Sequence, residues 1–138
     1  MSEFTEQTRQ LRQWVEKAEN DLINAEHTLT LKDNCPFDTI CFHAQQCAEK
    51  YLKALLFHRL IQFPKTHDLR VLIQLAPEDI RGNLAAGEIL KLNRYSVEAR
   101  YPDDWEPFTR EEAECAVAIA RQVRAEVRKN LPPEALDD

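Results

Sequence analysis

The stretch HAQQCAEKYLKALL, residues 43–56, decides the fold, because its apolar side chains recur at helical spacing and continue on both sides of it. One helical face collects Phe37, Cys41, Ala44, Ala48, Tyr51, Leu52 and Leu55. The opposite face collects Phe42, Gln46, Glu49, Lys53 and Phe57. This second face is either a solvated surface with a Glu49–Lys53 pair, or a partner surface or pocket lip flanked by two exposed phenyl rings.

The composition predicts an all-helical chain. Of 138 residues, 43% are hydrophobic and 30% charged, and only two are glycine, the residue on which tight turns depend. The formal net charge of -6 excludes a duplex-binding surface spread over the whole domain. Any contact with nucleic acid must therefore be local.

The same helical spacing extends outward from residue 43 in both directions. The expected helices cover about residues 4–31, 36–60, 68–75, 80–95 and 110–129. Thr66 or Asp68 is expected to cap the third, and Thr109 with Glu112 forms a capping box before the last. We expect one domain at residues 1–130, an antiparallel up-and-down bundle of about five helices, with residues 131–138 as a flexible tail.

The cysteines and the hydropathy pattern predict a soluble, cytoplasmic protein with reduced thiols. The four cysteines form no CxxC pair, no signal peptide is recognisable, and no apolar run approaches the roughly 20 residues that span a bilayer. His43 and Cys47 stand at i,i+4 spacing, but two ligands do not make a metal site. We therefore expect no metal and no cofactor.

Three blocks of the sequence resemble one known family. They are CFHAQQCAEKYLKALL at 41–56, FPKTHDL at 63–69 and RYSVEARYPD at 94–103. In this order they resemble the HEPN domain, the higher eukaryotes and prokaryotes nucleotide-binding domain, over about residues 8–128. The resemblance implies a five-helix bundle, a homodimer, and a minimal nucleotidyltransferase as partner.

The sequence departs from the family in one respect that concerns catalysis. Many HEPN proteins are ribonucleases that use an Arg followed, after four to six residues, by a His. Here Arg94 and Arg100 both lie after the last histidine, His67. Arg59 precedes His67, but seven residues separate the two. We therefore assign no catalytic residue. The alternatives are a divergent ribonuclease toxin of a toxin–antitoxin pair that uses Arg94, Arg100 and His67 in another arrangement, and a helical interaction domain without nucleotide chemistry.

The same blocks contain donors suited to a nucleotide or RNA phosphate. The candidate nucleotide-binding residues are Lys50, Lys53, His67, Arg94, Arg100 and Tyr101. Arginine grips phosphate through paired donors and tyrosine stacks on a base, so we expect a ligand between the second helix and the loop after the fourth. In the alternative interpretation His67 makes only a local hydrogen bond, and Arg100 pairs with Glu49, Asp103 or Asp104 as a structural clamp.

Overall fold

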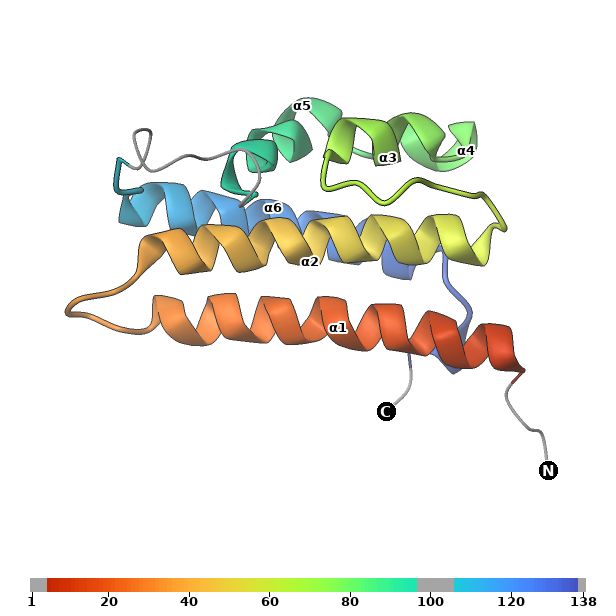
Figure 1. The fold of residues 1–138 in the computed structure, drawn as a ribbon, viewed down its shortest axis with the longest axis horizontal. Coiled ribbons are helices and arrows are strands. Elements are labelled where there is room, and N and C mark those ends of the chain that lie inside the picture. Colours follow the sequence, from red (N-terminus) through yellow and green to blue (C-terminus); the bar gives the residue numbers. More distant parts are fainter. Residues whose placement is uncertain (1–4, 97–105, 137–138) are drawn as a thin grey trace.

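The structure is a computed structural model that describes residues 5–96 and 106–136 (Figure 1). Its long helices are α1 (Glu6–Leu29), α2 (Phe37–His58) and α6 (Arg110–Arg128). Its shorter elements are α3 (Leu69–Leu75), α4 (Glu78–Arg81), α5 (Ala86–Ile89) and two 3-10 helices, η1 (Leu90–Tyr95) and η4 (Pro133–Ala135). No strand occurs within the described ranges, so the all-α prediction is confirmed.

Helix α2 lies at the centre of the bundle. It packs against α1 on one side, against α6 behind it, and against α3 and η1 on the other side (Figure 1). Ion pairs Arg121–Glu26 and Arg124–Glu19 show that α6 runs antiparallel to α1. With α2 also antiparallel to α1, the chain forms the predicted up-and-down bundle.

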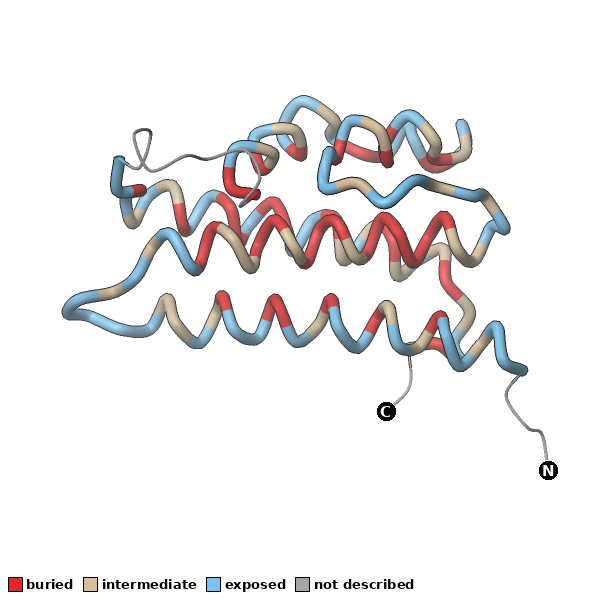
Figure 2. Tube along the Cα trace, in the orientation of Figure 1, coloured by how far each residue is buried: buried red, intermediate tan, exposed pale blue. Residues whose placement is uncertain are grey.

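The burial pattern explains the two-faced sequence of α2. Its predicted apolar face is buried from Cys41 onward, and so are Gln45, Glu49 and Lys53, at 0%, 3% and 8% exposure. Figure 2 shows buried positions along most of α2. The interpretation of this second face as a solvated surface is wrong, because α3 and η1 pack against α2 and His67 contacts Gln45 and Glu49. The rings expected to be exposed there are not: Phe57 packs against the core and Phe42 is half-buried.

Local capping chemistry sets the helix boundaries as predicted. The Asp68 carboxylate accepts from the backbone N–H of Arg70 at 2.9 Å and caps α3. Thr109 and Glu112 form the reciprocal capping box of α6. Helix α2 ends in a Schellman motif, in which Leu60 takes the left-handed position with a φ of 61°.

The predicted single helix at residues 80–95 is wrong, since the segment is divided into α4, α5 and η1. Between Leu84 and Ile89 the apolar spacing is five residues, which would turn the two side chains about 140° apart on one α-helix. Breaking the helix returns both to the core. From Ile89 the buried residues recur every third position, through Leu92 and Tyr95, which is the period of a 3-10 helix.

Residues 131–136 also differ from the prediction of a flexible tail. Leu131 and Ala135 are buried, at 7% and 3% exposure, and Nη1 of Arg12 donates to the carbonyl oxygen of Glu134 at 2.8 Å. Proline at the start of η4 fixes the backbone for a 3-10 turn, and the two apolar side chains anchor it to α1.

Phe108, just before α6, is buried at 8% exposure and packs edge-to-face on Tyr95, with ring centroids 4.8 Å apart. The backbone N–H of Phe108 donates to the Asp38 carboxylate at 3.1 Å, which fixes the approach to α6. None of the helices described could serve as a membrane span by length and hydropathy.

Candidate functional site

A buried carboxylate organises the second face of α2. Oε1 of Glu49 accepts from Nε2 of Gln45 at 3.1 Å and lies 3.0 Å from Nδ1 of His67, while Oε2 accepts from Nζ of Lys53 at 3.0 Å. Gln46 completes this set of residues, the Glu49 cluster, by donating to Oε1 of Gln45 at 2.7 Å. Three other positions on α2 and one on the following segment thus converge on a single acid.

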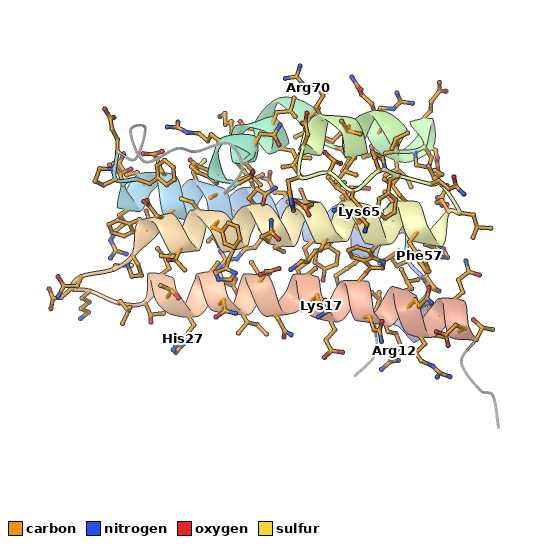
Figure 3. All side chains as sticks on the ribbon, viewed as in Figure 1. Arg12, Lys17, His27, Phe57, Lys65 and Arg70 are labelled. Atoms are coloured by element: carbon orange, nitrogen blue, oxygen red, sulfur yellow. The ribbon has the colours of Figure 1, made fainter. Side chains whose placement is uncertain are left out.

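The Glu49 cluster is fixed because its polar groups satisfy one another. Gln45 also donates to the backbone carbonyl of His67 at 3.2 Å, which ties the segment before α3 to α2. A buried carboxylate needs such donors to offset the loss of water. Lys65 lies on the same covering segment, and Phe57 near the end of α2 (Figure 3).

Two of the predicted site residues, Lys53 and His67, therefore meet at Glu49. Asp68 caps α3 as expected, but the His67 ring contacts a side chain 18 positions away in sequence, so its expected local bond is not what holds the ring. Lys53 is 10% exposed at the side chain and His67 43%. Only His67 of this pair is open to solvent to a large extent.

Arg94 lies on a segment that is tied to the start of α3. Oδ1 of Asn93 accepts from the backbone N–H of Leu69 at 2.9 Å, and Nδ2 of Asn93 donates to Asp68 at 2.9 Å. The Arg94 guanidinium lies 5.7 Å and 5.4 Å from the ring centroids of Tyr95 and Phe108. At 65% exposure its side chain is open to solvent, with Nη1 3.8 Å from Glu112.

Lys50 belongs to a different group of charges. Its Nζ lies 2.6 Å from Oδ2 of Asp21 on α1, and Nδ1 of His43 lies 2.8 Å from Oδ1 of the same carboxylate. Asp21 is 7% exposed, so this group braces α1 against α2, whereas the Glu49 cluster lies beneath the segment before α3. The structure does not bring Lys50 together with Lys53 and His67.

Arg100 and Tyr101, the other two candidates, lie outside the described residues. Glu49 is one of the three carboxylates that the clamp interpretation gives as partners of Arg100. The Glu49 carboxylate already accepts from Gln45 and Lys53 and contacts His67.

His43 and Cys47, the pair at i,i+4 spacing, do not share a metal-binding environment in the structure. Cys47 is fully buried, at 0% exposure, and burial, with the nearby carboxylates of Glu19 and Asp21, raises the pKa of its thiol well above the usual range. His43 is held by Asp21. Within the described ranges no three His, Cys, Asp or Glu side chains form a group that could hold a metal.

A third polar group, which the sequence interpretation missed, joins α1, α2 and α6. The Glu19 carboxylate accepts from the Tyr51 hydroxyl and, in bidentate fashion, from Nε and Nη2 of Arg124 at 2.7 and 3.0 Å. Nη1 of Arg128 donates to the Tyr51 hydroxyl at 3.2 Å and lies 3.9 Å from Glu19. We call these four residues the Glu19 cluster.

Burial and hydrogen bonding act in opposite directions on Glu19. Burial raises the pKa of its carboxyl, but the bonds from Arg124 and Tyr51 and the charge of Arg128 outweigh it, so the net pKa is lowered. The pKa of Tyr51 is raised beyond its usual range by burial and by its bond to Glu19. Tyr51 therefore stays a neutral donor at physiological pH.

A sequence signal existed for only part of these groups. Asp21 stands three residues after Ala18 and four before Ala25, at the spacing of the apolar stripe, and an acid in a stripe requires a buried partner. Nothing in the local pattern marked Tyr51, which is at an apolar position of α2. In sequence, Arg124 and Arg128 have the spacing that is typical of the solvated face of an amphipathic helix.

Comparison with known proteins agrees with this architecture. The family profile of the HEPN domain matches residues 11–130. The crystal structure of an archaeal HEPN homologue superposes with a TM-score of 0.59 at 27% identity, covering 85% of this chain and 97% of that one. No curated protein gives a significant match. The three sequence blocks, the central α2 and the matched profile lead to one conclusion, that this chain belongs to the HEPN domain family.

Proposed function

We propose that this protein is a binding module that holds a phosphate-bearing ligand, a nucleotide or RNA, at the exposed edge of the Glu49 cluster. The observation that carries the proposal is the clasp by Asn93, which links the Arg94 segment to the start of α3 directly after His67. Two exposed cationic or protonatable side chains thereby belong to one local structure, in a chain whose net charge of -6 would otherwise repel phosphate.

The residues of the proposed site have unequal roles. His67 and Arg94, at 43% and 65% side-chain exposure, are accessible for direct contact. Lys53 is nearly enclosed and neutralised by Glu49, so it supports the site from beneath. Arg100 and Tyr101 complete the proposed set, and Lys50 is left out of it because it is bound to Asp21 on α1.

Calorimetry with ATP, other nucleoside triphosphates and short oligonucleotides tests the site. Arg94→Ala and Arg100→Ala should each weaken binding at least about tenfold, equivalent to 1.4 kcal/mol. Lys91→Ala is the matched control, because Lys91 is on the same 3-10 helix, is 58% exposed and pairs with Glu88. Absence of binding to every ligand, or equal losses for Lys91→Ala and Arg94→Ala, would leave these residues as a structural clamp.

We further propose that the module forms a homodimer and pairs with a minimal nucleotidyltransferase. Membership of the HEPN family supports both associations. Light scattering at micromolar concentration should give a mass near twice the 16.1 kDa of the chain. A mass of one chain would contradict the dimer, and a neighbouring reading frame without a nucleotidyltransferase signature would weaken the proposed pairing.

One observation favours the alternative, a divergent ribonuclease. Nδ1 of His67 lies 3.0 Å from a buried carboxylate, the arrangement that orients an imidazole for acid–base catalysis, and Arg94 lies on the adjoining segment. We expect little or no cleavage of RNA by the purified protein, because the family's Arg-to-His motif is absent. Cleavage that His67→Ala or Arg100→Ala abolished would replace the binding proposal with the enzymatic one.

A further inference from the structure

A polar cavity of about 440 Å³ lies between α1, α6 and the segment that contains η4. Its charged lining comprises Arg12, Glu16, Glu19, Arg124 and Arg128, and its apolar lining includes Val15, Ile23 and Leu136. Arg12 projects on the side of α1 that is turned away from α3 (Figure 3). The volume is within the range of small-molecule pockets, about 300–1,000 Å³.

The lining has a surplus of positive charge. It carries three arginines and two glutamates, whereas the whole chain has a net charge of -6. Within the Glu19 cluster a single carboxylate faces two guanidinium groups, since Arg124 and Arg128 are one helical turn apart on α6. Tyr51 contributes a neutral hydroxyl and no negative charge.

The Arg128 guanidinium has N–H donors that the Glu19 cluster does not use. Its Nη1 contacts the Tyr51 hydroxyl at 3.2 Å and Glu19 at 3.9 Å, and Nε and Nη2 have no hydrogen-bond partner in the described part of the chain. The side chain is 25% exposed, and no buried side-chain nitrogen or oxygen in that part of the chain is unsatisfied, so these donors are open to solvent. A guanidinium with two accessible donors suits a carboxylate or a phosphate.

The apolar part of the lining limits the kind of anion. Ile23 is one of the few large hydrophobic side chains in the described ranges that are strongly exposed, at 61%, and it lines this cavity. Val15 and Leu136 line the same space from α1 and from the C-terminal segment. A ligand with an apolar group beside its charge would cover Ile23 while it reached Arg128.

We propose that this cavity is a second ligand site, separate from the Glu49 cluster, that takes a small carboxylate or phosphate monoester bearing an apolar group. Arg128 is its main contact and Arg124, fixed by Glu19, adds positive potential. Glu16, exposed and part of the lining, opposes the anion. Single substitutions should therefore be able to weaken the affinity of the site, by removing Arg128, or to strengthen it, by neutralising Glu16.

An NMR titration of the full chain tests this, with phenyl phosphate, benzoate and inorganic phosphate as probes and benzyl alcohol as the neutral control. Phenyl phosphate and benzoate should shift amide signals within residues 12–23 and 124–136. Inorganic phosphate should bind more weakly because it lacks the apolar group, and benzyl alcohol should cause no saturable shift because it lacks the charge.

Three variants test whether the residues of this cavity bind the anionic probes. Arg128→Gln should weaken phenyl phosphate at least about tenfold, and Glu16→Gln should strengthen it at least about twofold. Arg121→Gln is the matched control, because Arg121 lies on the same helix but pairs with Glu26 and does not line the cavity. If thermal unfolding shows that Arg128→Gln is not folded, the affinity of Glu16→Gln for phenyl phosphate is the test. An increase supports the site, and an unchanged affinity contradicts it.

The proposal is overturned if no anionic probe gives saturable shifts, if the shifts cluster elsewhere, or if Arg121→Gln weakens binding as much as Arg128→Gln. Failure of the nucleotide site would look different. In that case Arg94→Ala and wild type would be alike in nucleotide titrations, while the response to phenyl phosphate and its dependence on Arg128 would remain.

Discussion

The Glu49–Lys53 ion pair gives the most demanding prediction, because both side chains are nearly enclosed, at 4% and 10% exposure. Glu49→Leu removes the acceptor of a buried ammonium and of the fully buried amide of Gln45. Leaving one partner of a buried pair uncompensated costs about 3–5 kcal/mol. That is a large share of the roughly 5–15 kcal/mol that stabilises a domain.

The double variant Glu49→Leu/Lys53→Met separates burial of charge from loss of packing. With the ammonium gone as well, no unpaired charge remains, and replacing both members of a buried pair by apolar groups is often close to neutral. We expect the double variant to recover at least about 2 kcal/mol relative to the sum of the single variants, the coupling seen between residues of one network.

Urea unfolding followed by circular dichroism measures these differences, provided that the dependence on denaturant stays constant among the variants. Glu88→Leu is the matched control, since the Glu88–Lys91 pair has similar geometry, at 2.7 Å, but exposures of 49% and 58%. It should cost less than about 0.5 kcal/mol. A loss below about 1 kcal/mol for Glu49→Leu, or a double variant no better than additive, would refute the reasoning from burial.

Three further substitutions test separate parts of the structure. Glu19→Gln should destabilise the protein at neutral pH, because the lowered pKa of Glu19 in the folded state contributes stability at pH values above its unfolded pKa. That contribution is lost on acidification, so the difference in stability from wild type should shrink as the pH falls below the ordinary glutamate range. Thermal unfolding between pH 3 and 7 measures this difference, and a constant difference would contradict the prediction. Leu60→Gly should stabilise the fold by about 1 kcal/mol, since residue 60 is left-handed and its leucine side chain is 77% exposed, and an unchanged urea midpoint would argue against strain there. Thr109→Ala should cost about 1 kcal/mol by removing the α6 capping box, whereas Thr109→Ser should be nearly silent in the same assay.

Local signals carried most of the fold. Apolar spacing located α1, α2 and α6, and the capping residues Asp68 and Thr109 gave the starts of α3 and α6. Those features depend on interactions within a few residues along the chain, which sequence patterns record directly. The break between Leu84 and Ile89 also has a sequence signal, an irregular five-residue interval between apolar positions that one continuous helix does not accommodate.

Tertiary structure decided which polar residues became buried and which came together. Glu49 and Lys53 have the spacing of a surface pair, and only the covering by α3, η1 and the segment 59–68 makes them interior groups. His67 meets Glu49 from 18 positions away, and Lys50 turns instead to Asp21, 29 positions away. The Glu19 cluster depends on three helices, with Arg124 105 positions from Glu19.

The sequence by itself thus determined the three long helices, their order and the HEPN family, because periodicity, caps and motif order are properties of neighbouring residues. The tertiary structure alone determined the partners of Glu19, Asp21 and Glu49. The reason is that a charged side chain on an amphipathic helix has the same local pattern whether water or another helix faces it, and only the packing of distant elements distinguishes the two.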